Sequence, residues 1–426
     1  MLDIRFIREN PELVQRAADR RGIALSVRDL LRLDEERRRL VAEIEKLRHD
    51  RNRRSEEIGA LIREGAREQA ERVKEQVRRA NVRLDELEEE MAGIKAEYDR
   101  LMLLVPNPAS PDTPEGASDA DNVEIRRVGD IPAFDFEPKD HVELGERLGI
   151  LDLARGVKVA GARGYFLKGN GFRLQQAVLR LAMDVLERRG FIPMDVPLIV
   201  REDALVHTGF FPIGRDQTYE LKGEGKFLTG TSEVSLVSYF SGEILDLDEP
   251  VRVAAWTSCF RSEVGSAGRD VHGLYRVHQF AKVEQVVLCR NDPDESERML
   301  QEMTRNAEEI LRLLELPYRV MAICAGDLPQ KTYKQYDIET WMPSRRAYGE
   351  TQSSSNLLDF QARRANIRYR EADGTARFCH TLNCTAIASP RILIPLLEVH
   401  QREDGSVRIP EALRPYMDGL AELRPV

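Results

Sequence analysis

The sequence lacks the marks of several large protein classes. Its five cysteines include no CxxC pair, so the pattern favours neither a zinc ribbon nor a disulfide framework. The opening residues, MLDIRFIREN, lack the apolar core of a signal peptide, and no apolar run is long enough to span a membrane. We therefore expect a cytoplasmic protein without a membrane partner and without zinc.

The sequence also lacks an excess of positive charge and the common nucleotide-binding motifs. The net charge of −9 excludes a globally basic nucleic-acid binder, although a local basic patch remains possible. Neither GxxxxGK[ST] nor a GxGxxG after a strand occurs, which excludes a P-loop and a Rossmann site. With 426 residues, of which 42% are hydrophobic, the chain is long enough for two or three domains with a real core.

Proline is absent between Ser26 and Leu104, where apolar residues follow a heptad rhythm. Folding the chain at Gly65 pairs Leu47 with Leu87, and the same antiparallel register pairs the rest of the seam. The rhythm therefore predicts a hairpin of two long helices. The second helix carries the clearest run: Val73, Val77, Ala80, Leu84, Leu87, Met91, Ile94, Tyr98 and Leu101.

Charge is distributed unevenly along this predicted arm. Arg48–Arg79 holds ten basic and seven acidic side chains, whereas Asp85–Glu97 holds six acidic and one basic. Two interpretations stay open: a solvated coiled coil that acts as a rod or dimerisation element, or an arm whose basic half follows a phosphate backbone. The candidate phosphate contacts are Arg51, Arg53, Arg54, Arg78 and Arg79.

A stretch rich in proline and aspartate, VPNPASPDTPEGASDADN, follows the arm. We expect an arm domain over residues 1–104, a linker over 105–122 and a second domain over 123–426. In the second domain, helical stretches such as Phe172–Arg189 mix with apolar strands that come mostly as neighbours. This order favours an α+β fold with an antiparallel sheet.

Two of the predicted strands, VRVAAWTSCF and LYRVHQFAKVEQVVL, carry or adjoin charged residues at Arg261, Glu263, Arg276 and Glu284. Arginine presents a planar fork of donors that suits phosphate. Glutamate accepts hydrogen bonds from amines, or reaches a phosphate through a metal ion. The combination indicates a ligand that has phosphates, a metal and an amino group, held on an antiparallel sheet.

The same residues carry a resemblance to a known family. FRSE, followed by GSAGRD and RVHQFAKVE, resembles motif 2 of class II aminoacyl-tRNA synthetases in its seryl form. GFIPMDVPLIV is similar to motif 1, and SPRILIPLLEVHQREDGSVRIPEALRPYM is similar to motif 3. TSE, YDIETWMPS, SSNLLDFQARRANIRYR, HTLN and FEPKDHVELGERLGILD also resemble segments of seryl-tRNA synthetases, as does the N-terminal hairpin. The resemblance covers nearly the whole chain.

This resemblance implies a homodimer whose catalytic domain is an antiparallel sheet flanked by helices. It implies an enzyme that activates L-serine with ATP and Mg²⁺ and then charges tRNA(Ser), and also tRNA(Sec), with the helical arm gripping the tRNA. Two alternatives remain: a paralogue that makes seryl-adenylate for an acceptor other than tRNA, and a non-catalytic RNA-binding paralogue.

The resemblance also implies roles in ATP binding. Arg261 would hold the α-phosphate and the serine carboxylate. Arg391 would hold the γ-phosphate, and Arg276 the outer phosphates as well. Phe280 and Arg391 would enclose the adenine, with Glu263 near its edge.

For the metal, the resemblance implies Glu350 and Ser353 as Mg²⁺ ligands, and Arg261, Arg391 and Glu350 are the expected catalytic residues. The serine pocket must bond a hydroxyl group, because apolar walls alone discriminate poorly. The residues implied for this pocket are Thr231, Glu233, Arg261, Glu284, Asn383 and Thr385.

Two positions depart from the family pattern. Gln352 stands where a small residue is common, and in a regular strand it would share a face with Glu350. Cys384 stands where Gly or Asn is common, and strand alternation would turn it away from Asn383 and Thr385.

Overall fold

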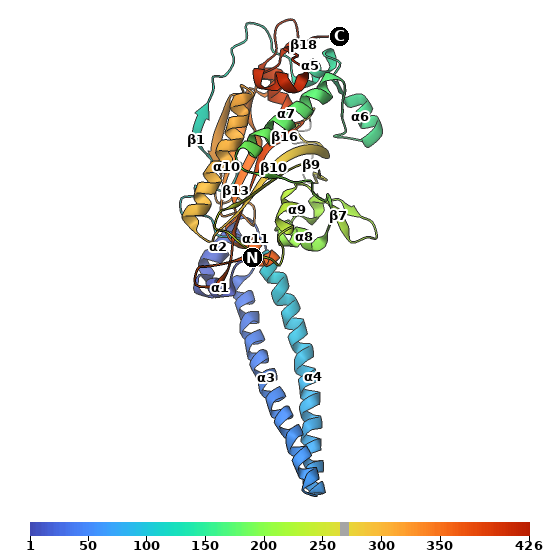
Figure 1. The fold of residues 1–426 in the computed structure, drawn as a ribbon, viewed down its shortest axis with the longest axis vertical. Coiled ribbons are helices and arrows are strands. Elements are labelled where there is room, and N and C mark those ends of the chain that lie inside the picture. Colours follow the sequence, from blue (N-terminus) through green and yellow to red (C-terminus); the bar gives the residue numbers. More distant parts are fainter. Residues whose placement is uncertain (265–271) are drawn as a thin grey trace. The chain divides into compact units, whose positions relative to one another are not determined.

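The computed structural model describes residues 1–264 and 272–426 and forms two compact units (Figure 1). The first unit is Leu2–Val105, and the second is Pro106–Val426 together with Met1. The GSAGRD part of the predicted motif 2 lies outside the described residues. The division at residues 104 and 122 stays a prediction. In the structure Asn107 is buried and its side chain donates to the carbonyls of Lys331 and Leu357.

The first unit is entirely helical in its regular structure. Ser26 caps the third helix by accepting from the Asp29 N–H at 3.2 Å. Gly65 turns the chain between the two long helices with a φ of +77°, which glycine adopts without strain. The helices are α1 (Ile4–Glu9), α2 (Pro11–Arg20), α3 (Val27–Arg63) and α4 (Arg67–Leu104).

Helices α3 and α4 lie side by side as the predicted hairpin (Figure 1). Its centre is a cluster of buried apolar residues: Leu40, Ile44, Leu84 and Leu87, with Leu47, Met91 and Ile94 packed against them. Arg37 interrupts the apolar seam but adapts to it, because its guanidinium lies 4.9 Å from the Tyr98 ring centroid and 3.2 Å from an Asp34 carboxylate oxygen. The antiparallel hairpin expected from the heptads is confirmed.

The second unit is built around an eight-stranded sheet with the order β1-β11-β12-β13-β16-β10-β9-β4. Neighbouring strands are antiparallel except β4 and β9. This confirms the predicted α+β class with a mostly antiparallel sheet. The strands are β1 (Val123–Val128), β4 (Ile192–Pro193), β9 (Val251–Phe260), β10 (Gln279–Cys289), β11 (Tyr318–Ala322), β12 (Lys334–Met342), β13 (Ala347–Asn356) and β16 (His380–Ser389).

Smaller sheets and short helices complete this unit. The helices are α5 (His141–Arg147), α6 (Leu153–Ala160), α7 (Asn170–Arg188), α8 (Glu202–His207), α9 (Glu233–Ser238), α10 (Pro293–Leu313), α11 (Phe360–Ala365) and α12 (Leu393–Val399), with 3₁₀ turns η1 (Asp119–Asp121), η2 (Arg215–Gln217), η3 (Pro343–Arg345) and η4 (Glu411–Met417). The small-sheet strands are β2 (Leu151–Asp152), β3 (Phe166–Leu167), β5 (Ile199–Arg201), β6 (Glu220–Leu221), β7 (Lys226–Leu228), β8 (Ile244–Leu245), β14 (Arg368–Arg370), β15 (Ala376–Phe378), β17 (Val407–Arg408) and β18 (Glu422–Leu423).

The two faces of the large sheet have separate cores. On β10, Val283 and Val287 belong to the larger cluster, which includes α7 and α10. Val286 and Leu288 point the other way, into the cluster that includes residues of α9 and α11. Glu284 shares this second face by alternation, so the charged positions of the strand lie on the side of α9 and α11. Among the described helices, none combines the length and the apolar character that a membrane crossing requires.

Candidate active site

The structure brings the sequence-predicted site residues together around one cavity of about 480 Å³ in the second unit. The cavity lies over β10, β13 and β16 and beside the residue that follows β9, so residues that are distant in sequence converge there. All of the residues predicted for ATP, serine or Mg²⁺ line it: Thr231, Glu233, Arg261, Glu263, Arg276, Phe280, Glu284, Glu350, Ser353, Asn383, Thr385 and Arg391.

Arg261 follows directly on β9 and points into the cavity. Its Nε donates to the Gly230 carbonyl at 3.3 Å, and its guanidinium carbon lies 5.3 Å from the Phe280 ring centroid. Nearby, Arg276 Nη1 lies 3.1 Å from Glu263 Oε2. Glu263 has a φ of +52°, a conformation that non-glycine residues adopt only at a cost in strain and that is common at functional sites.

Arg391 follows the C-terminal end of β16 and lines the cavity. Its Nε donates to the Tyr275 carbonyl at 3.0 Å, and its guanidinium carbon lies 4.4 Å from the Tyr275 ring centroid. Its Nη1 lies 3.7 Å from Glu350 Oε2. The guanidinium over Phe280 is therefore that of Arg261, and the predicted enclosure of adenine between Phe280 and Arg391 stays a prediction.

A β-bulge on β13 sets the orientation of the predicted metal ligands. Gln352 pairs with Ile338, and Glu350 pairs with the next residue, Glu339, so one extra residue lies between them on β13. Paired residues share a face and consecutive residues do not, so Glu350 and Ser353 point to the same side. The shared face that a regular strand would give Gln352 and Glu350 is therefore absent, because the strand is not regular there.

Glu233 is the first residue of α9, and one oxygen of its carboxylate accepts hydrogen bonds from three side chains. Lys331 Nζ lies 2.6 Å, Gln361 Nε2 2.7 Å and Asn383 Nδ2 3.0 Å from its Oε1. Sequence reasoning missed Lys331 and Gln361. Gln361 stands in the quoted SSNLLDFQARRANIRYR segment, whereas no local signal marks Lys331, which lies in a connection between strands.

A second buried ion pair faces the same cavity from β10. Lys282 Nζ lies 2.5 Å from Glu284 Oε2, which also accepts from Thr385 Oγ1 at 3.2 Å. Burial raises the pKa of Glu284 and lowers the pKa of Lys331. Lys282 was also missed, although it stands two residues before Glu284 and so shares its face of the strand.

Comparison with known proteins places this geometry in a family. A family model described as the tRNA synthetase class II core domain (G, H, P, S and T) matches residues 218–400, and one described as the seryl-tRNA synthetase N-terminal domain matches residues 1–109. Proteins named serine–tRNA ligase from Deinococcus radiodurans and Carboxydothermus hydrogenoformans are each 44% identical over 98% of both chains. The chain belongs to the seryl-tRNA synthetase family.

Solved structures of the family agree with this membership. The seryl-tRNA synthetase of Pyrococcus horikoshii, complexed with ATP, matches with a TM-score of 0.93 and 40% identity over 100% of both chains. The cytoplasmic serine–tRNA ligase of Naegleria fowleri, in complex with AMP, matches with a TM-score of 0.87 and 28% identity over 100% of this chain and 99% of that one. Family membership confirms the predicted ligase class and the class II fold.

Of the two departures from the family pattern, Cys384 lies as expected. It is buried in the larger hydrophobic cluster with Leu382 and Ala386, on the face opposite Asn383 and Thr385. The pattern of alternating residues on β16 therefore leaves the cavity face to the polar positions.

Of the arm arginines, Arg53, Arg78 and Arg79 are exposed, whereas Arg51 and Arg54 are half-buried. Arg53 is 3.2 Å from Asp50, and Arg78 and Arg79 are 3.5 and 3.4 Å from Glu75. Such exposed pairs are weak and are readily exchanged for other partners. The full predicted set spans both helices of the hairpin: Arg51, Arg53 and Arg54 on α3, and Arg78 and Arg79 on α4.

Proposed function

We propose that this protein activates L-serine with ATP to form seryl-adenylate, and then transfers the seryl group to the 3′ end of tRNA(Ser). The observation that carries the proposal is the convergence of all the residues predicted for ATP, serine or Mg²⁺ on one cavity. The names of the relatives, and the ATP and AMP in complex with the two structural neighbours, support the same assignment.

In the first step a serine carboxylate oxygen attacks the α-phosphorus of ATP. A new O–P bond forms, the bond from that phosphorus to the β-phosphate oxygen breaks, and pyrophosphate leaves with the electron pair. The attacking group is already an anion, so no general base is required. Positioning and charge neutralisation by Arg261, Arg276 and Arg391 supply most of the catalysis, with Arg261 at the reacting phosphate.

The donor set near Glu350 fits Mg²⁺, which prefers oxygen ligands and takes the rest of its coordination from phosphates and water. Glu350 and Ser353 share one face of β13, and Asp337 pairs with Ser353. Burial and the nearby Glu350 carboxylate raise the pKa of Asp337 well above its usual range. Negative charge is therefore unfavourable at this position, and a bound cation would stabilise it. In the described part of the chain no group of three or more His, Cys, Asp or Glu side chains could hold a metal by itself. Bound Mg²⁺ would neutralise phosphate charge.

The serine end of the cavity is assigned to the two ion pairs and their neighbours. Two carboxylates, Glu233 and Glu284, pair with two ammonium groups, Lys331 and Lys282. This arrangement has no net charge and suits a zwitterionic amino acid. A serine hydroxyl group can add a hydrogen bond to this polar cluster. A ligand without a hydroxyl group cannot make that bond, so the cluster favours serine.

The acceptor step is assigned to the arm, and we propose residues 1–104 as the tRNA-binding domain, 105–122 as the linker and 123–426 as the catalytic domain. Replacing Leu33–Leu101 with a short turn should leave serine-dependent pyrophosphate exchange near the parental rate and raise the KM for tRNA steeply. An unchanged KM for tRNA would mean that the hairpin is only a rod.

A milder test changes charge without removing the arm. Replacing the five predicted arginines by Gln should flatten the log–log salt dependence of tRNA binding by roughly 0.7 to 0.9 for each tRNA phosphate that the variant no longer neutralises. The matched control is Arg83→Gln with Arg100→Gln, because both are exposed on the same hairpin outside the basic half. Equal slopes in the two variants would contradict the assignment.

Three further assignments extend this proposal. We propose tRNA(Sec) as a second acceptor, the cytoplasm as the location, and a homodimer. For the dimer, exposed Phe166 and Phe172 and the 72% exposed Val159 line a second cavity of about 620 Å³. Phe172→Glu should convert the dimer to a monomer in light scattering, and a monomeric parent protein would refute the assembly.

The decisive experiment is ATP–pyrophosphate exchange with each of the twenty amino acids, followed by aminoacylation of total tRNA. We expect exchange with serine and charging of tRNA(Ser). Exchange without charging would favour the paralogue that serves another acceptor. Binding of RNA without exchange would favour the non-catalytic paralogue.

A further inference from the structure

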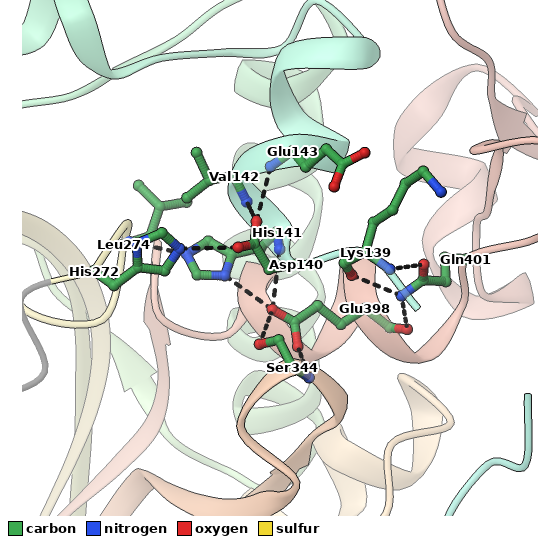
Figure 2. Close-up of polar contacts among 10 residues, drawn as sticks. All are labelled: Lys139, Asp140, His141, Val142, Glu143, His272, Leu274, Ser344, Glu398 and Gln401. Atoms are coloured by element: carbon green, nitrogen blue, oxygen red, sulfur yellow. Dashed lines mark hydrogen bonds and ion pairs between the residues drawn. The ribbon is translucent and has the colours of Figure 1, made fainter. Parts of the chain in front are cut away.

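A buried polar network connects α5, α12 and the segment before β10 that contains His272 and Leu274 (Figure 2). His141, the first residue of α5, is 4% exposed, and Glu398, near the end of α12, is fully buried. Their side chains meet at 2.9 Å between Nδ1 and Oε1. Glu398 also accepts from the His141 backbone N–H at 3.0 Å, and from the Ser344 N–H and hydroxyl at 3.0 and 2.8 Å.

These partners assign the tautomer of the imidazole. Nδ1 faces a carboxylate oxygen, which can only accept, so Nδ1 carries the hydrogen. Nε2 is then an acceptor, and it receives the Leu274 backbone N–H at 3.2 Å. His141 therefore links Glu398 on one side to the main chain of Leu274 on the other.

The backbone approaches the imidazole too closely for any side chain to intervene. Gly273 has a φ of +62°, and a Cβ placed there would lie 2.0 Å from His141 Nε2. A second contact holds the same segment, since His272 Nε2 lies 3.0 Å from an oxygen of Asp140, the residue that caps α5. His272 and Leu274 are thus held against the start of α5 (Figure 2), with Gly273 between them.

The next two residues belong to the cavity. The Tyr275 carbonyl accepts from Arg391 Nε at 3.0 Å and its ring lies under the Arg391 guanidinium, whose carbon is 4.4 Å from the ring centroid. Arg276 follows and contacts Glu263 at 3.1 Å. The position of the main chain at Leu274 consequently sets where both phosphate-binding arginines stand.

We propose that His141 is a positioning residue for ATP binding: through its acceptor nitrogen it fixes the Leu274 main chain, and with it Tyr275, Arg276 and Arg391. The inference rests on the proposed function. His141 lies outside the set of residues that line the cavity, so it acts through Leu274 and not by contact with the nucleotide.

Two substitutions separate the two contacts of the imidazole. His141→Asn places its amide where Nδ1 stands, so it can keep the bond to Glu398 but has no atom at Nε2. His141→Gln reaches the Nε2 position with its amide oxygen, so it can keep the bond to Leu274. We expect His141→Asn to raise the KM for ATP about tenfold and His141→Gln to raise it less than about threefold, each with the KM for serine unchanged.

A matched control is His400→Asn. His400 is also buried, at 6% exposure, and its Nε2 lies 2.9 Å from the Leu314 carbonyl, away from the cavity. We expect it to lower the thermal midpoint without changing the KM for ATP. This control measures what the loss of a buried imidazole does to stability alone.

The result that overturns the proposal is a KM for ATP that rises equally in both His141 variants, or more in His141→Gln. Equal increases in the KM for ATP and the KM for serine would also overturn it, since a general loss of structure gives that pattern. Direct titration of ATP in a calorimeter reports the same contrast without any turnover. If the parent protein fails to exchange pyrophosphate with serine, the proposed function fails, while the ATP affinities of the variants still decide the role of His141.

Discussion

Replacing Glu233 by Gln tests the buried charge arrangement in the part of the cavity that we propose for serine. Glu233 is 3% exposed, and it is the counter-ion of Lys331, whose ammonium also lies 4.0 Å from the Phe210 ring centroid. Glu233→Gln keeps the shape but leaves the Lys331 charge uncompensated. Breaking a buried pair from one side costs about 3 to 5 kcal/mol. The upper bound at pH 7 is the cost of deprotonating a lysine with an ordinary pKa of 10.5, about 5 kcal/mol.

The assay is urea unfolding of four proteins: the parent, Glu233→Gln, Lys331→Met and the double variant. We expect the double variant to regain most of the loss, because it removes both charges together. The loss in Glu233→Gln should shrink as the pH rises toward 10, since the unfolded chain then also releases the lysine proton. A loss below about 1 kcal/mol, or additive effects in the double variant, would refute the reasoning.

Four other outcomes follow from the structure. Arg261→Ala should lower the kcat of pyrophosphate exchange by roughly 10²-fold, since the charge-assisted bonds form at the reacting phosphate; exchange at the parental rate would refute its role. Phe280→Leu should raise the KM for ATP more than the KM for serine, because leucine lacks a flat face; the reverse order would contradict it. Burial lowers the pKa of His380 to about 4, so the free energy of unfolding should fall by up to about 3 kcal/mol as the pH falls from 6.5 toward 4. His380→Gln should make the free energy of unfolding, measured with urea, depend less on pH in this range; the parental pH dependence would contradict this. Elemental analysis should find no zinc in the purified protein, and one zinc per chain would show the prediction wrong.

The arm was predictable because its structure is periodic. A heptad seam fixes which residues face inward, and a single turn at Gly65 fixes the register of the entire hairpin. Arg37, the charged residue within the apolar seam, follows the same rule. The register that pairs Leu40 with the opposite helix also places Arg37 against Tyr98. Such local rules need no knowledge of the rest of the chain.

The cavity was predictable for a different reason. Glu284 on β10 pairs with Thr385 on the neighbouring strand β16, so both side chains lie on the same face of the sheet. The motif resemblance selected both positions. Alternation failed at Glu350, where a bulge adds one residue to β13. A bulge is decided by how two strands fit together, so the sequence of β13 alone does not reveal it, and the orientation of the predicted metal ligands was therefore open to error.

The contacts that support the cavity were out of reach of sequence patterns altogether. His141 and Glu398 are separated by 257 residues and His141 and Leu274 by 133, yet each pair forms a direct hydrogen bond. No periodicity connects positions so far apart. A histidine that folds into the interior is, moreover, most often a core residue whose hydrogen bonds are satisfied. Only when the chain is folded does the imidazole appear between a carboxylate that fixes its tautomer and the main chain that leads to two arginines. The sequence therefore reveals which groups line the cavity more readily than it reveals what holds those groups in place.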